Sequence, residues 1–207
     1  TLLFLTHTGS ETFDAVVTIP APRTTPARAA QILDPMHGRV GEVFVAHTPD
    51  GASRLPLRIR PGESLFVRLS ATPSGLPPWN ELRTVGTPLP LSGAWHVAFV
   101  AGGPVLPAPR TVDALGDWSG WDDACRDFSG TACYRRAFTV PDPDAAWAVE
   151  LGEVLHSARV RVNGVDAGTL VGRPWRLPLP PLRPGENLLE VFVANLDANR
   201  LAALDRA

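Results

Sequence analysis

Residues 159–170 read RVRVNGVDAGTL, and this stretch decides the fold class. Apolar and polar side chains alternate up to Asn163-Gly164, which is the period of a strand that is buried on one face. Asn-Gly readily takes the positive φ angles of a tight hairpin turn. We therefore predict a β-hairpin in which Asn163 and Gly164 form the turn. Val165 and Asp166 either extend that turn or restart the strand.

Short runs of the same kind recur along the whole chain, separated by Gly, Pro, Asn or Asp. No long segment has helical period, so the sequence predicts an all-β sandwich protein. Expected strands in the first half are residues 2–7, 13–19, 29–33, 40–47, 55–59 and 64–70. Those in the second half are 95–100, 134–140, 146–151, 158–162, 167–170 and 188–195. Residues 198–207 are expected to form a short helix or a tail.

One segment, ATPSGLPPWNELRTVGTPLPLSG at residues 71–93, interrupts the succession of strands. It is rich in Pro and Gly and has little periodicity, which is typical of a linker. We therefore predict two β-sandwich units. The first is a small sandwich at residues 1–75, the linker covers 76–90, and the second unit covers 91–207.

The composition argues against several partner classes. The chain of 207 residues has 19 basic and 21 acidic residues and a formal net charge of −2. This near balance disfavours nucleic acid and an anionic membrane surface as partners. No apolar run approaches the roughly 20 residues that span a bilayer. The sequence opens on TLLFLTHTG, with the pattern of a strand and not of a signal peptide, so we expect a fragment of a longer polypeptide.

Five segments of the second half share an ordered set of motifs. The first two are LSGAWHVAF (91–99), which contains a Trp strand, and DWSGW (117–121). The third, DFSGTACYRRAFTVP (127–141), has Phe-Ser-Gly before a Tyr strand, and the fourth, VELGEVLHSARVRVNGVDAGTLVGRPWRLPLP (149–180), has a Val-Asn-Gly hairpin. The fifth, LRPGENLLEVFVANLDANRL (182–201), has a Pro-Gly-Glu-Asn turn before a strand that ends in Asn. In order and spacing these segments resemble the sugar-binding-type β-sandwich of family 2 glycoside hydrolases, and in particular the C-terminal region of family 106 α-L-rhamnosidases. The first half resembles the small sandwich that such enzymes carry before it, through FLTHTGSETFDAVVTI (4–19), ILDPMHGRV (32–40) and LRIRPGESLFVRL (57–69).

This resemblance implies that the second unit is a galactose-binding-like jelly roll. The catalytic carboxylates of such enzymes lie on a (β/α)₈ barrel, and this sequence has no alternating strand–helix pattern that could build one. The resemblance therefore implies a non-catalytic accessory region of a periplasmic or extracellular glycosidase. Its partner would be a carbohydrate or a neighbouring catalytic barrel domain. Two alternatives remain open: a structural or interaction module without a ligand, and a self-contained glycosidase.

One loop, residues 117–128, concentrates carboxylates and indole rings and is called here the Asp–Trp loop. Its candidate members are Asp117, Trp118, Trp121, Asp122, Asp123 and Asp127. Aromatic rings can stack on a sugar while carboxylates accept its hydroxyl hydrogens, so Trp118, Trp121, Asp122 and Asp123 are candidate carbohydrate-binding residues. The same loop could instead be a solvated turn above buried indoles. A third hypothesis is a calcium site made by the four carboxylates, because neighbouring oxygen ligands suit a hard cation. No other cofactor is expected.

Trp175 follows Pro174 and is a further candidate for contact with carbohydrate, although packing in the core or at a domain interface suits an amphipathic indole equally. Cys125 and Cys133 are the only cysteines. In a sandwich that the resemblance places outside the cytoplasm, an even count predicts a disulfide between them. Two free buried thiols are the alternative.

Overall fold

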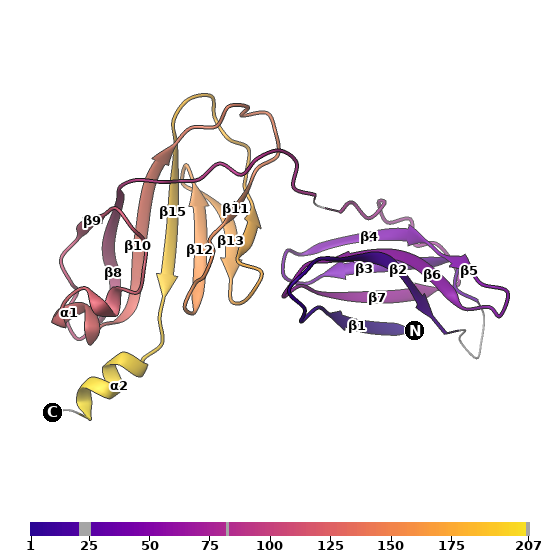
Figure 1. The fold of residues 1–207 in the computed structure, drawn as a ribbon, viewed down its shortest axis with the longest axis horizontal. Helices are drawn as coiled ribbons and strands as arrows, with labels where there is room; N and C mark the ends of the chain where they lie inside the picture. Colours follow the sequence, from indigo (N-terminus) through magenta and orange to yellow (C-terminus); the bar gives the residue numbers. More distant parts are fainter. Residues whose placement is uncertain (21–25, 82, 206–207) are drawn as a thin grey trace. The chain divides into compact units, whose positions relative to one another are not determined.

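A computed structural model describes residues 1–20, 26–81 and 83–205. The protein is all-β, as the alternating pattern predicted, and it divides into two compact units, Thr1–Thr87 and Pro88–Ala207 (Figure 1). Within the described ranges, no helix is long and apolar enough to cross a membrane.

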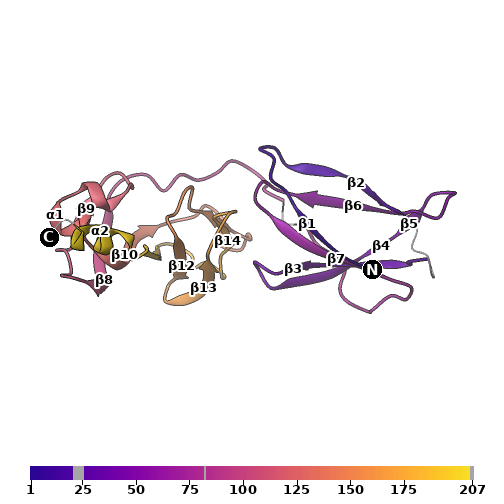
Figure 2. The same cartoon turned by 90° about the horizontal axis from the view of Figure 1, so that it is seen from below.

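Unit 1 consists of a four-stranded and a three-stranded antiparallel sheet (Figure 2). The first has the order β1-β7-β3-β4 and the second the order β2-β6-β5. The strands are β1 Leu2–Thr6, β2 Phe13–Ile19, β3 Ala29–Asp34, β4 Arg39–Phe44, β5 Ala46–His47, β6 Ser53–Ile59 and β7 Ser64–Ser70. Alternate residues of both sheets form one buried cluster that includes Ile32, Leu55 and Val67. Burial of these inward rows is what drives the two sheets together.

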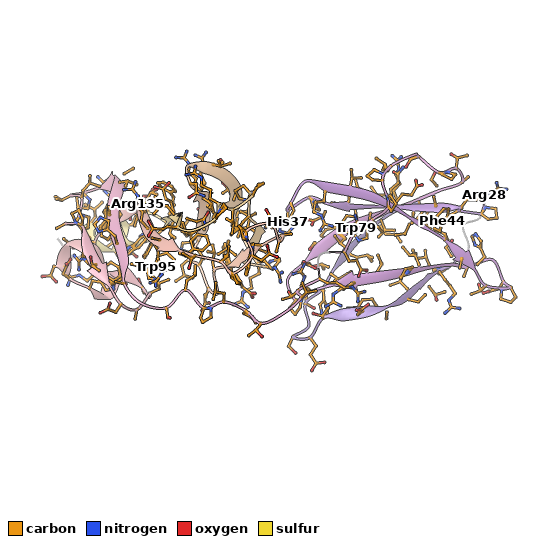
Figure 3. The ribbon with its side chains drawn as sticks, turned by 90° about the horizontal axis from the view of Figure 1, so that it is seen from above. Arg28, His37, Phe44, Trp79, Trp95 and Arg135 are labelled. Atoms are coloured by element: carbon orange, nitrogen blue, oxygen red, sulfur yellow. The ribbon has the colours of Figure 1, made fainter. Side chains whose placement is uncertain are left out.

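The first residues of the predicted linker belong to unit 1. The backbone N–H of Glu42 donates to the carbonyl of Pro77, and the N–H of Trp79 donates to the carbonyl of Glu42, both at 2.9 Å. The Trp79 side chain (Figure 3) packs against the core of unit 1. The Arg39 guanidinium lies 4.5 Å from the centroid of its ring. A Cβ at Gly41 would lie 2.7 Å from the Cα of Trp79, so only glycine permits this approach. Unit 1 therefore extends beyond residue 75.

Unit 2 contains a six-stranded sheet of order β13-β12-β15-β10-β8-β9 and a two-stranded sheet of order β11-β14. The strands are β8 Trp95–Gly103, β9 Arg110–Val112, β10 Ser129–Phe138, β11 Ala148–Glu150, β12 Ser157–Val162, β13 Val165–Leu170, β14 Arg176–Pro178 and β15 Asn187–Ala194. Three short helices complete the unit: the 3₁₀ helix η1 Trp118–Gly120, α1 Asp123–Arg126 and α2 Ala198–Leu204. For residues 198–207 a short helix or a tail was expected, and α2 is that helix. Residues 206 and 207 lie outside the described residues.

The predicted hairpin joins β12 to β13. Val162 pairs with Val165, so the connection is a two-residue turn, and Asn163 and Gly164 have φ angles of 53° and 81°. Both angles are positive, as a type I′ turn requires. The strand restarts at Val165 and the turn is not extended. Asn163 does more than turn the chain, because its Oδ1 accepts from the N–H of Leu188 at 2.9 Å.

The buried side chain of Asn187 closes the same end of the six-stranded sheet. Its Oδ1 accepts from Asn163 Nδ2 at 2.8 Å and from the N–H of Arg183 at 2.9 Å. Its Nδ2 donates to the carbonyls of Arg183 and Gly185 at 3.0 and 3.1 Å. The Val-Asn-Gly and Pro-Gly-Glu-Asn motifs, distant in sequence, thus form one hydrogen-bonded corner.

A second polar cluster closes the opposite end of β15. The amide of Asn195 donates to the carbonyl of Phe128 at 3.0 Å and accepts from the N–H of Gly130 at 2.7 Å. The hydroxyl of Ser129 donates to the carbonyl of Leu196 at 3.1 Å and accepts from the N–H of Arg200. The Phe-Ser-Gly motif and the strand-ending Asn therefore hold β10, β15 and α2 together.

Candidate functional site

The Asp–Trp loop lies between β9 and β10 and is built around two helix N-caps. The carboxylate of Asp117 accepts from the N–H of Ser119 at 2.9 Å at the start of η1. That of Asp122 accepts from the N–H of Cys125 at 2.8 Å at the start of α1. Side-chain oxygens at these positions satisfy N–H groups that a helix leaves unpaired. Two of the candidate carboxylates therefore have a structural role.

Trp118 is a core residue. Its side chain is buried, and its ring stacks on Tyr134 with centroids 6.4 Å apart. Phe99 and Phe128 contact its edge, with centroids at 5.6 and 6.2 Å. Burial also raises the pKa of the Tyr134 hydroxyl to about 12. Because Trp118 is only 5% exposed within this aromatic cluster, it has no free ring face for a sugar.

Trp121 is partly exposed and belongs to a surface group with Arg110 and Asp122. The Arg110 guanidinium lies 5.2 Å from the centroid of the Trp121 ring. Its Nη2 donates to Asp122 Oδ2 at 2.5 Å. The hydrogen bond from Arg110 lowers the pKa of the Asp122 carboxyl to about 2. Arg110 was not among the residues predicted from the sequence, because β9 has only three residues and shows no recognisable period.

The remaining two carboxylates share one arginine. Arg126 Nη1 lies 2.7 Å from Asp123 Oδ1, and Arg126 Nε lies 3.2 Å from Asp127 Oδ1. Across the described parts of the chain, no three His, Cys, Asp or Glu side chains are grouped so that they could hold a metal ion. The calcium hypothesis for Asp117, Asp122, Asp123 and Asp127 therefore gains no support, because their oxygens cap helices or pair with Arg110 and Arg126.

Trp175 is also buried and directly precedes β14 of the two-stranded sheet. The carbonyl of Trp175 accepts from the N–H of Leu151 at 2.8 Å, next to the pairing of β11 with β14. Its indole is only 9% exposed. The structure therefore places it as a packing residue. Of the three candidate indoles, Trp121 alone keeps appreciable exposure.

The predicted disulfide between Cys125 and Cys133 is wrong: both thiols are free and buried. Cys133 lies on β10 opposite Phe192 and Ala98, next to Arg135 and Glu190. Cys125 is the buried residue of α1 and lies near Tyr134. Because successive residues of a strand point to opposite faces of the sheet, Cys133 and Tyr134 face away from each other. The two thiols therefore lie on opposite faces of β10.

We expect thiol labelling to confirm this arrangement. Under denaturing conditions without reductant, two thiols per chain should react. In the native protein labelling should be slow, because burial raises the pKa of both thiols, that of Cys125 to about 11, and only the thiolate reacts. Finding no reactive thiol in denaturant would contradict the structure.

The Arg110–Asp122 pair predicts an acid-dependent loss of stability. The carboxyl of Asp122 has a pKa of about 2 in the folded protein, below its ordinary value of 3.8. Its stabilising contribution is therefore complete above about pH 4 and disappears as the pH falls towards about 2. Asp122→Asn keeps a capping oxygen but not the charge.

We expect this variant to lose less thermal stability than the wild type between about pH 4 and pH 2. Melting curves at several pH values measure the difference. The control is Asp123→Asn, whose carboxylate is 90% exposed and which should follow the wild type. Equal slopes for wild type and Asp122→Asn would show that the pair does not form.

The two-unit sandwich has known relatives among glycoside hydrolases, although no protein-family model matches the chain. Over 97% of its length the chain superposes on the structure of a rhamnosidase from Novosphingobium sp. PP1Y, with a TM-score of 0.75 and 29% sequence identity. Over 128 residues, 59% of the chain, it is 36% identical to a Formosa agariphila protein named "Putative beta-glucuronidase". A Bifidobacterium dentium β-glucuronidase structure matches 51% of the chain at 25% identity, with a TM-score of 0.42.

The likenesses to the rhamnosidase structure and to the Formosa agariphila protein confirm the resemblance to glycoside hydrolases: the chain is an all-β sandwich region related to them. The match is to a small part of each relative. The chain spans 19% of the rhamnosidase chain and 11% of the Formosa agariphila protein.

Proposed function

We propose that this chain is a non-catalytic accessory region of an α-L-rhamnosidase-like glycoside hydrolase, located in the periplasm or outside the cell. The observation that carries the proposal is the similarity of nearly the whole chain, 97%, to only 19% of a rhamnosidase chain. Such a ratio is expected of one region within a larger enzyme. The location rests on the family resemblance alone, because the cysteines do not form the disulfide that would have supported it.

The state of the loop carboxylates supports a non-catalytic role. A glycosidase needs a general acid, whose pKa is raised so that it holds a proton at the working pH, beside a second carboxylate. The pKa of Asp122 is instead lowered to about 2, and its oxygens are occupied by Arg110 and the N-terminus of α1. Asp123 and Asp127 both pair with Arg126. Asp122 therefore lacks the raised pKa of a general acid, and the other two carboxylates are engaged by an arginine.

The purified chain is therefore expected to show no turnover of an aryl α-L-rhamnoside or an aryl β-glucuronide. The longer polypeptide that contains it should hydrolyse a glycoside. Turnover by the chain alone that is lost in Asp122→Asn would overturn the non-catalytic proposal. An inactive longer polypeptide, tested against a broad panel of aryl glycosides, would overturn the hydrolase context.

A second candidate function, carbohydrate binding, has support from one surface. Trp121 keeps part of its ring accessible beside a charged donor, Arg110, and a charged acceptor, Asp122. Indole faces and charged hydrogen-bonding groups together are typical of sugar sites. Binding to a glycan array that is lost in Trp121→Ala and retained in Asp123→Asn would support this role. Binding unaffected by Trp121→Ala would reject this surface as the site.

A further inference from the structure

The outer face of the four-stranded sheet of unit 1 carries a continuous row of apolar side chains. Phe4 of β1 pairs with Phe66 of β7, Phe66 with Leu33 of β3, and Leu33 with Val40 of β4. Residues paired in this way point to the same face of the sheet. Leu2 adds to the row, because it lies two residues before Phe4 on β1. These five residues, Leu2, Phe4, Leu33, Val40 and Phe66, are called the apolar stripe.

The apolar stripe faces away from the core of unit 1. The inward rows of the same strands are Leu3 and Leu5, Leu65 and Val67, and Ala30 and Ile32, which belong to the core or pack against it. In the stripe, Leu2 is 61% exposed, Phe4 59% and Val40 44%, while Phe66 and Leu33 are partly buried. The rings of Phe4 and Phe66 lie 5.0 Å apart, so the row is continuous. The sheet that carries it is seen in Figure 2.

Folding of unit 1 gives no reason for an apolar outer row. An antiparallel sheet that faces water on one side normally alternates apolar residues inward with polar residues outward. Single exposed apolar residues are common, but a contiguous row across all strands of a sheet marks an interaction site. The nearby carboxylate of Glu42 is already satisfied, since it accepts from the N–H of Ser74 at 2.7 Å and from its hydroxyl at 2.5 Å. The next row of the same face is polar, since Leu2 pairs with Arg68, Arg68 with Gln31 and Gln31 with Glu42, so only the stripe itself would favour an apolar partner.

The size of the apolar stripe argues for a tethered partner over a second copy of the chain. Leu2, Phe4 and Val40 are about half exposed and Leu33 and Phe66 are partly buried, so the stripe offers on the order of 300 Å². A stable association between separate molecules needs about 800 Å² from each partner. A domain joined by the same polypeptide is held at a roughly millimolar effective concentration, so a smaller apolar contact is sufficient.

We propose that the apolar stripe docks against an apolar surface of another domain of the longer polypeptide to which this chain belongs. This inference rests on the proposed accessory function. Unit 1 would then serve as a support that is fixed to its neighbour through the outer face of the β1-β7-β3-β4 sheet.

Hydroxyl-radical footprinting with mass spectrometry tests the contact. Oxidation of Leu2, Phe4 and Val40 is compared between the isolated chain and the longer polypeptide. We expect it to be several-fold lower in the longer polypeptide. Oxidation of Val16, which is 50% exposed on the outer face of the other sheet, should be unchanged. Equal oxidation of the stripe in both proteins would overturn the proposal.

Two other results would also overturn it. Protection of the stripe in the isolated chain that grows with concentration would identify a second copy as the occupant. Protection in the isolated chain that is independent of concentration would identify unit 2 as the occupant. The footprint does not depend on hydrolysis. A protected stripe in a longer polypeptide without glycosidase activity would uphold the docking surface and overturn only the proposed function.

A pair of matched variants gives an independent readout. Leu2→Ser with Val40→Ser should leave the melting temperature of the isolated chain unchanged, because both residues are exposed. The same double variant should lower the melting temperature of the longer polypeptide. The control Val16→Ser should change neither. An unchanged melting temperature of the longer polypeptide with the double variant would contradict the docking surface.

Discussion

Asn187→Leu is expected to destabilise unit 2 by about 3 to 4 kcal/mol, among the largest effects that a single side chain of this protein can have. Asn187 is 1% exposed and makes four hydrogen bonds. Leucine has the same branching at Cγ and is larger, so no packing volume is lost. The substitution instead leaves the N–H of Arg183, the amide of Asn163 and two carbonyls without their partner. Buried groups that lose a partner carry their full desolvation penalty.

Urea unfolding followed by tryptophan fluorescence measures this loss. Five of the six Trp residues lie in unit 2, so the signal reports mainly on that unit. The control is Glu186→Gln, in the same turn but exposed, which should change stability by less than about 0.5 kcal/mol. If Asn187→Leu lowers the free energy of unfolding by less than about 1 kcal/mol, water replaces the missing hydrogen bonds and this corner of the sheet is accessible to solvent.

Gly130→Ala is expected to prevent folding of unit 2 or to destabilise it by roughly 4 kcal/mol or more. Gly130 on β10 faces Gly102 on β8, and a Cβ on Gly130 would lie 2.1 Å from the carbonyl oxygen of Ala101 and 2.6 Å from the Cα of Gly102. Both contacts are with backbone, which cannot move aside without separating the strands. The ring of Phe128 fills the space above the two glycines at 2.6 Å from the same Cβ position.

The reciprocal variant and a neutral glycine complete this test. Gly102→Ala should be nearly as harmful, because its Cβ would lie 2.3 Å from the carbonyl oxygen of Ser129. Gly116→Ala should be tolerated, because nothing lies within 4 Å of its Cβ position. Soluble yield and the urea midpoint give the comparison. A Gly130→Ala protein with wild-type stability would show that β8 and β10 are not paired in this register.

The limits of the strands show where sequence reasoning works. β2 and β7 occupy the ranges predicted for them. In β7 the burial alternates residue by residue, and a turn at Pro61-Gly62 precedes the strand. β9 and β14 were missed, since three residues are too few to show a period. β10 starts at Ser129, five residues before the predicted start. The start was missed because Gly130, which pairs with Gly102, has no side chain that could contribute to an apolar–polar alternation.

The candidate site was predicted less well than the fold. The sequence located the loop and its residue types, and it left open whether the indoles were buried. It could not show that Trp118 stacks on Tyr134 or that Arg110 pairs with Asp122. Arg110 and Tyr134 reach the loop from β9 and β10, and their places depend on how these strands are registered against β8.

The sequence by itself determined the all-β class and the turn at Asn163-Gly164, because strand period and the positive φ angles of Asn-Gly are local properties. Only the tertiary structure decided that Cys125 and Cys133 lie on opposite faces of β10, that Asn187 joins two distant turns, and that Phe4, Phe66, Leu33 and Val40 form one row. The last two depend on register between strands far apart in sequence, and the first depends on where α1 packs relative to β10. A shift of one residue in register moves every side chain to the other face, and no short stretch of sequence records that choice.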